Sequence, residues 1–229
     1  MSFEDKILVG ITTTKSRRPQ DHWKKQLEEV EKLGIKKAAI FPTTLNSEQR
    51  KEFYAALEKS GLEEIPLVHI RGQDFTEEEL EYFVKIFKTK WFNCHTNELN
   101  SMYLKFPRFK EKILLELQFI NAVNNRVEPN KLGGFCIDLA HHWAAKLRNY
   151  VEYSYVNQRI KNTPVRANHL NGFNAKKEID IHFISSLKQF DYLKELPKEL
   201  FSEVIAFEVE NSIAAQLRFK EYVVKLLEN

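Results

Sequence analysis

The sequence has few cysteines, little net charge and no long apolar run, and each shortage excludes a class of protein. Its 229 residues include only Cys94 and Cys136, both inside apolar runs, so we expect packed, reduced thiols and no disulfide framework. Lysine and arginine number 35 against 32 acidic residues, and this net charge of +3 neither indicates nor excludes a polyanionic partner. No run approaches the roughly 18 apolar residues that a membrane span needs. The charged start, Ser2 to Lys6, is not typical of a signal peptide, so we expect a soluble, cytoplasmic protein.

The chain does have enough apolar material for one large core. Apolar residues make up 43% of the sequence, including 17 phenylalanines and 8 tyrosines. It contains no linker, internal repeat or low-complexity segment. We therefore predict one domain over residues 1–229, and we expect a monomer.

Apolar runs of strand length alternate with amphipathic runs of helical length along the whole chain. The predicted strands cover 6–12, 37–41, 65–70, 90–95, 113–119, 134–138, 165–170 and 204–210. The predicted helices cover 19–33, 47–61, 76–88, 101–111, 143–158 and 212–227. We assign 179–184, although apolar, to a long loop after the seventh strand. Eight apolar strands with intervening helices predict an α/β fold, a parallel sheet closed into a single (β/α)8 TIM barrel. An open doubly wound sheet would show the same alternation with fewer strands.

Histidines and carboxylates recur at the ends of these predicted strands. In a TIM barrel the C-terminal ends of the strands form the working face, so these side chains should meet there. A buried carboxylate such as Glu116 is costly unless a cation or hydrogen bonds compensate its charge. The positions are His69, His95, Glu116, Asp138, His141, His169, Asp180 and His182, with either Glu208 or Glu210 as the ninth.

Imidazoles and carboxylates together are ligands for borderline divalent metals, zinc above all, with manganese and iron as alternatives. A lone strand histidine such as His69 or His95 is more often a hydrogen-bonded core residue than a ligand. The joint placement of nine such groups nevertheless predicts a metal site.

Three segments resemble endonuclease IV, the zinc-dependent apurinic/apyrimidinic endonuclease family, whose fold is a xylose-isomerase-like TIM barrel. They read GFCIDLAHHWAA from Gly134, NHLNGF from Asn168 and DIHF from Asp180. The family has the same order of a Cys-x-Asp-x-x-His run, a His-x-Asn segment and an Asp-x-His pair. With the earlier His and Glu positions, the resemblance spans nearly the whole chain.

The resemblance implies two or three zinc ions per chain. His69, His95 and Glu116 would hold the first ion, and Glu116 would bridge to a second that Asp138, His169 and Glu208 also hold. His141, Asp180 and His182 would hold the third. Glu208 is preferred to Glu210 by its place in the strand, although the two point the same way.

The resemblance implies a metal-dependent phosphodiesterase of DNA repair that cleaves DNA at abasic sites, with Glu116 or Glu208 orienting the attacking water. A sugar or sugar-phosphate isomerase or epimerase is the first alternative, because it would use the smaller set Glu116, Asp138, His169 and Glu208 on a small sugar. A multinuclear non-heme iron oxidase is the second alternative. A barrel that keeps metal for structure alone, or binds damaged DNA without cutting it, is the non-enzymatic alternative.

Overall fold

The computed structural model describes residues 2–14, 22–96, 105–123 and 128–228. Its main sheet is entirely parallel and has the strand order β1-β11-β8-β7-β6-β5-β4-β3-β2. The bounds are Ile7–Leu8 (β1), Gly10–Thr12 (β2), Ala39–Phe41 (β3), Leu67–His69 (β4), Trp91–His95 (β5), Ile113–Glu116 (β6), Gly134–Asp138 (β7), Val165–Leu170 (β8) and Ile205–Phe207 (β11).

The sheet closes because its two end strands, β1 and β2, are one stretch of chain interrupted only at Val9. β1 pairs with β11, whereas β2 pairs with β3, so the predicted first strand touches both neighbours and completes a barrel. Gly10 lies where the backbones come closest, and a Cβ there would be 1.8 Å from the Phe207 carbonyl oxygen. Glycine is therefore required at the closure. The predicted (β/α)8 TIM barrel is confirmed.

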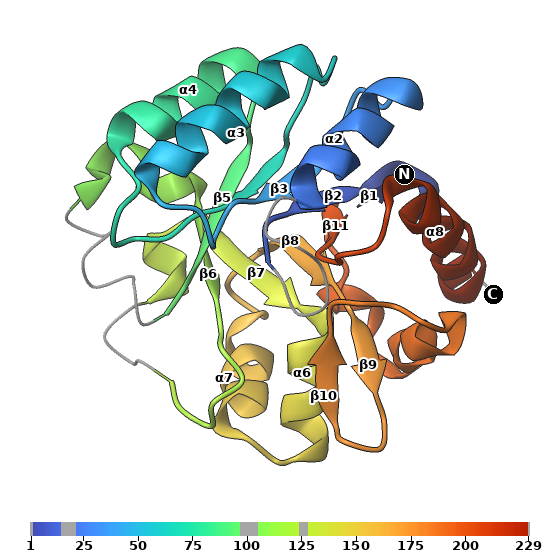
Figure 1. The fold of residues 1–229 in the computed structure, drawn as a ribbon. Helices are drawn as coiled ribbons and strands as arrows, with labels where there is room; N and C mark the ends of the chain where they lie inside the picture. Colours follow the sequence, from blue (N-terminus) through green and yellow to red (C-terminus); the bar gives the residue numbers. More distant parts are fainter. Residues whose placement is uncertain (1, 15–21, 97–104, 124–127, 229) are drawn as a thin grey trace.

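Helices surround the barrel on its outer side (Figure 1). Their bounds are Phe3–Lys6 (α1), His22–Lys32 (α2), Ser47–Lys59 (α3), Glu77–Phe87 (α4), Leu139–Leu147 (α6), Val151–Arg159 (α7) and Ile213–Glu228 (α8), with 3-10 helices at Pro107–Lys112, Pro129–Lys131, Leu187–Glu195 and Lys198–Leu200. Residues 101–104 of the predicted fourth helix and 19–21 of the first lie outside the described residues. No helix within the described ranges is long and apolar enough to cross a membrane.

Side chains of the strands divide into two apolar layers. Those that point outward pack under the helices in the larger core, as Phe92 and Leu115 do. Those that point inward fill the barrel, as Leu67, Leu114 and Cys136 do. This two-sided burial explains why the strands read as continuous apolar runs. The inward apolar layer stops below the C-terminal ends of the strands, where polar side chains take over.

The predicted loop assignment for 179–184 is wrong. Ile179–Ile181 forms β10, which pairs antiparallel with β9, Gly172–Asn174. The two strands make a hairpin that projects beside α6 (Figure 1). Short apolar runs do not distinguish a strand from a buried loop, so only the pairing revealed it.

The predicted helix over 143–158 is also wrong, because the chain forms two helices there. α6 ends at Leu147 and α7 begins at Val151, with Asn149 between them in the left-handed region at a φ of 52°. Asparagine tolerates this conformation better than most residues. The apolar spacing continues across the break, which is why periodicity alone predicts one helix.

Candidate metal centre

Six of the nine predicted ligands come together at the C-terminal mouth of the barrel. Each is supplied by a different strand, at its last residue or within one residue of its end. They are His69 of β4, His95 of β5, Glu116 of β6, Asp138 of β7, His169 of β8 and Glu208 just after β11. Only His95 is partly exposed, and the other five are at most 7% exposed.

His169 is the centre of this cluster. Its Nδ1 lies 3.2 Å from Glu116 Oε1 and 3.2 Å from Glu208 Oε2. His69 lies on the other side of the same carboxylates, with Nε2 3.6 Å from Glu116 Oε2 and Nδ1 3.8 Å from Glu208 Oε1. His95 Nε2 is 3.7 Å from Glu116 Oε1. Each carboxylate therefore faces at least two imidazoles.

Three overlapping sets of ligand atoms each fit around one ion, with all atoms of a set within 4.8 Å of one another. The sets share members: Glu116, His69 and His169 each belong to two of them. Of these three, only the Glu116 carboxylate has two oxygens with which it could bridge neighbouring ions, whereas a neutral imidazole binds one ion. The sets are His69–His95–Glu116, His69–His169–Glu208 and Glu116–Asp138–His169.

The buried nitrogens of this cluster test whether a cation fits. Within the described part of the chain, His69 Nδ1 and both ring nitrogens of His169 are buried and make no hydrogen bond of good geometry, although carboxylate oxygens lie 3.2 to 3.8 Å from the two Nδ1 atoms. Buried polar atoms nearly always have a partner, and an unmet one is costly. Nitrogen and oxygen donors in buried, convergent sets match the preferences of zinc and similar divalent ions. The residues present therefore fit a divalent metal.

The electrostatics of the cluster show the same mutual dependence. Burial by itself would raise the pKa of Glu116, but the neighbouring His169, His69 and His95 hold it well below its ordinary value. Burial opposes protonation of His169, yet Cys136, Glu116 and Glu208 raise its pKa well above the ordinary value. Burial raises the pKa of Asp138. Without a cation, protonated imidazoles would thus neutralise the carboxylates.

The remaining three predicted ligands lie next to this cluster, and Asp180 contacts both histidines among them. His141 Nε2 is 3.6 Å from Asp180 Oδ1, and His182 Nε2 is 3.0 Å from Asp180 Oδ2. The His182 Nδ1 lies 2.8 Å from the Glu208 carbonyl oxygen, which ties the hairpin segment to β11. These three side chains do not form one of the compact ligand sets found among the described residues.

The structure separates Glu208 from Glu210. Glu208 faces His169 and His69, whereas Glu210 belongs to none of the three ligand sets found in the described ranges. β11 ends at Phe207, so the strand alternation that would make the two glutamates equivalent does not extend to them. Both are buried, and the Glu210 backbone N–H donates to the His182 carbonyl oxygen.

Two asparagines to which the sequence analysis gave no role hold the ligand carboxylates, although one of them, Asn171, lies in the His-x-Asn segment named there. Asn93 Nδ2 donates to Glu116 Oε2 at 2.6 Å, and Asn171 Nδ2 donates to Asp138 Oδ2 at 2.7 Å. The other Asp138 oxygen accepts the His141 N–H at 2.8 Å, which makes Asp138 the N-cap of α6. For Asn93 the signal in the sequence is an asparagine within an apolar run that ends in a predicted ligand, whereas Asn171 follows such a run.

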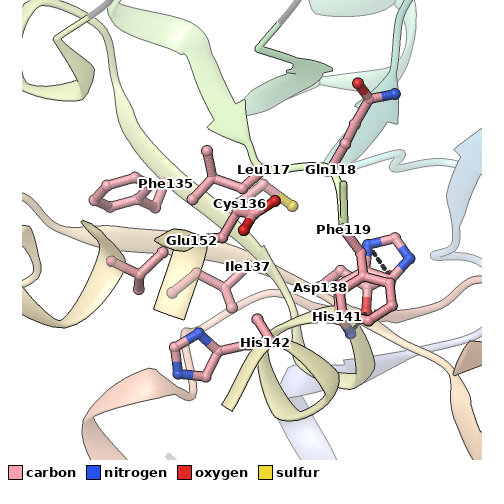
Figure 2. Close-up of a pocket in the computed structure, with 12 residues that line it drawn as sticks. Leu117, Gln118, Phe119, Phe135, Cys136, Ile137, Asp138, His141, His142 and Glu152 are labelled. Carbon is pink, nitrogen blue, oxygen red and sulfur yellow. Dashed lines mark hydrogen bonds and ion pairs between the residues drawn. The ribbon is translucent and has the colours of Figure 1, made fainter. Parts of the chain in front are cut away.

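The loop after β6 borders the cluster on the side of His141. Glu152 of α7 accepts hydrogen bonds from the backbone N–H groups of Ile120 and Ala122, at 3.0 and 3.1 Å. Phe119 in this loop lies nearly parallel to the His141 ring (Figure 2). Glu152 and His142 also line a cavity of about 20 Å³ there. The neighbouring His142 is buried against Tyr153, and burial lowers its pKa to about 4.

Both cysteines are buried and neither is in a disulfide within the described ranges. Cys136 points into the barrel below His169, and burial raises the pKa of its thiol to about 11. A thiol with such a pKa is protonated near neutral pH.

Comparison with known proteins supports the fold. No family model matches the chain, and no curated protein matches it. The solved structure of SacUVDE superimposes over 97% of this chain and 99% of that chain, with a TM-score of 0.50 and 13% identity. An uncharacterised protein from Parabacteroides distasonis matches over 95% of this chain and 98% of that one, with a TM-score of 0.49 and 14% identity. A D-tagatose 3-epimerase-like protein matches over 96% and 97%, with a TM-score of 0.47 and 13% identity. At such an identity the likeness to SacUVDE concerns the fold alone, a TIM barrel as predicted.

Proposed function

We propose that this chain is a divalent-metal-dependent hydrolase of phosphodiesters, with DNA at abasic sites as its substrate. One observation carries the proposal: Glu116 and His169 are each shared between overlapping ligand sets at the barrel mouth. Glu116 has two oxygens and would bridge neighbouring ions in such a centre, and a pair of ions suits in-line displacement at phosphorus. The resemblance of the Gly134, Asn168 and Asp180 segments to endonuclease IV supplies the choice of substrate.

His69, His95, Glu116, Asp138, His169 and Glu208 would hold two ions in this proposal, and His141, Asp180 and His182 would hold a third. Bound zinc ions would supply Lewis acidity toward phosphoryl oxygens and make hydroxide available near neutral pH.

The protein side chains would contribute orientation. The Glu116 and Glu208 carboxylates face the same imidazole from two sides, so either could accept a hydrogen bond from the attacking water and fix its direction. The mouth of the barrel is lined by buried side chains, and a preorganised, poorly solvated site strengthens every interaction with a developing charge.

The test is a nicking assay on a duplex with one synthetic abasic site, using protein whose metal content has been measured by elemental analysis. We expect nicking by the zinc-loaded chain and none after chelation or in the variant Glu116→Gln. The same duplex without the abasic site is the control for substrate choice. Fully loaded protein that leaves the abasic duplex intact would exclude this function.

A sugar or sugar-phosphate isomerase is the second candidate, and one observation favours it. The six compact ligands include the whole set Glu116, Asp138, His169 and Glu208, whereas His141, Asp180 and His182 form only pairs. An isomerase would need one tightly held ion to polarise a hydroxyl and carbonyl pair while carboxylates move a proton. One ion per chain together with interconversion of a sugar phosphate would support this candidate over hydrolysis.

A further inference from the structure

Asn93 is a fully buried polar residue inside the barrel, directly below the candidate metal ligands. It is 0% exposed and lies in the middle of β5. Side chains alternate along a strand, so Asn93 shares the inner face with Trp91 and His95. In register it lies between His69 of β4 and Leu114 of β6. An apolar side chain would be expected at this level, where Leu67, Leu114 and Cys136 fill the barrel.

The side-chain amide of Asn93 uses its donor but not its acceptor. Its Nδ2 donates to Glu116 Oε2, but its Oδ1 is buried without a hydrogen-bond partner among the described residues. Asn168 of β8, also 0% exposed, is different. Its Nδ2 donates to two backbone carbonyls and its Oδ1 accepts the Ser202 N–H at 2.7 Å. Asn168 therefore cross-links the barrel, whereas Asn93 makes one side-chain bond, and that bond goes to a predicted ligand.

The bond from Asn93 decides how the Glu116 carboxylate presents its two oxygens. Oε2 is held at 2.6 Å by the amide, and Oε1 is left facing His169 Nδ1 at 3.2 Å. Without this donor the carboxylate could rotate about its last side-chain torsion, because a wide range of angles about that bond is similar in energy. Glu116 belongs to two of the three ligand sets, so its rotation would disturb both.

Asn171 repeats the arrangement at a second ligand. Its Nδ2 donates to Asp138 Oδ2, and its Oδ1 is likewise buried without a hydrogen-bond partner in the described part of the chain. A buried amide that leaves its oxygen unmet destabilises the fold compared with an apolar residue of similar size. Two such amides each donate to the carboxylate of a predicted ligand. They indicate that the fold is less stable here than an apolar packing would make it, and that the amides serve to position the carboxylates.

We propose that Asn93 is a positioning residue of the metal centre, whose amide N–H fixes the Glu116 carboxylate in the orientation that receives the ion. Asn171 holds Asp138 in the same way. Outer partners of this kind tune ligand orientation and metal affinity. This inference rests on the proposed metal centre but not on the reaction it performs.

The test compares Asn93→Leu with the matched control Asn168→Leu, since both residues are buried strand asparagines. Leucine has the same branched, four-atom side chain as asparagine, with methyl groups in place of the amide, and it has no donor. Zinc affinity is measured by competition with a chromophoric chelator, and thermal unfolding is measured on the metal-free chains. For Asn93→Leu we expect zinc affinity to fall about 10- to 100-fold, with no decrease in the unfolding temperature of the metal-free chain. For Asn168→Leu we expect the reverse: a lower unfolding temperature and unchanged affinity in the folded protein.

A second variant keeps the proposal testable if Asn93→Leu does not fold. Asn93→Ser is smaller and keeps a hydroxyl that is too short to reach Glu116, so it should lose affinity as Asn93→Leu does. Zinc affinity equal to that of the wild type in the folded variants would overturn the positioning role and leave the metal centre intact. A wild-type chain that binds no zinc would overturn the metal centre itself and this inference with it.

Discussion

Individual residues at the barrel mouth depend on one another for charge. Glu116 and Glu208 are almost fully buried, and each would be costly there without positive charge beside it. His169 lies at 3.2 Å from both and supplies that charge when protonated. A divalent ion would take over this role and release the proton, since a metal-bound imidazole is neutral. The same side chains thus have a compensated arrangement with and without metal.

The two neighbouring glutamates after β11 allow a sharp test at the level of residues. We predict that Glu208→Gln weakens zinc binding, because it removes a charged ligand. Loss of a residue that only supports a ligand typically costs about 10- to 100-fold in affinity, and we expect at least that loss here. Glu210→Gln should leave zinc affinity unchanged, because Glu210 is in none of the described ligand sets. Chelator competition on both variants measures this. Equal losses in the two variants would mean that both glutamates contribute to the site.

At the scale of elements, the loops around the mouth are held by buried ion pairs. Arg50 of α3 has a fully buried side chain and donates to Glu79, to Asp74 and to the Leu45 carbonyl oxygen. Phe75 packs on its guanidinium, 4.2 Å from the ring centroid. These contacts join the loop after β3 to the loop after β4, whose strand ends in His69.

Removing this guanidinium should destabilise the barrel strongly. We predict that Arg50→Met lowers the free energy of unfolding by about 3 kcal/mol, because it leaves the Glu79 carboxylate without its cation, whereas Asp74 keeps its pairing with Arg71. The control is Arg108→Met, since Arg108 pairs with Glu77 and Glu81 but its side chain is 64% exposed. That change should have a much smaller effect, because water screens an exposed ion pair. Urea unfolding of the two variants measures the difference, and similar losses would contradict the distinction.

The hairpin of β9 and β10 carries part of the second group of predicted ligands, beside the barrel mouth. It carries Asp180, and its continuation carries His182 next to β11. Arg148 contacts the turn of this hairpin, because its guanidinium donates to the Lys177 carbonyl oxygen and packs on Phe119. The hairpin and the loop after β6 are therefore coupled through one side chain at the edge of the site.

At the scale of the whole molecule, the site draws on strands from most of the barrel, so metal binding should report on global stability. A ligand that binds only the folded chain, at about 100 times its dissociation constant, adds about 2.7 kcal/mol. For a chain of this size that corresponds to about 5–10 °C in unfolding temperature.

We therefore predict a lower unfolding temperature after chelation and recovery when zinc is returned in excess. The metal-free chain should still fold, because protonated imidazoles neutralise the buried carboxylates. Calorimetry with and without chelator measures both outcomes. An unfolding temperature that does not respond to zinc would contradict a metal centre shared among the strands.

The amino-acid sequence is enough to predict the barrel and the polar side chains at its mouth. Continuous apolar strands require cover on both faces, and in a parallel barrel their C-terminal ends share one side. Residues such as Glu116 and His169, placed where apolar runs end, could therefore be predicted to meet there. Their roles as ligands and catalysts remain predictions.

Contacts between distant parts of the chain set which of these residues converge and which neighbours hold them. Register and closure depend on pairings between distant strands. No local sequence pattern therefore predicts that His69 lies beside Glu116, or that Glu208 rather than Glu210 joins the cluster. The hairpin at β10, the break at Asn149 and the contact from Asn93 to Glu116 have the same origin. Each is set by long-range packing, which outweighs the weak preferences of short segments.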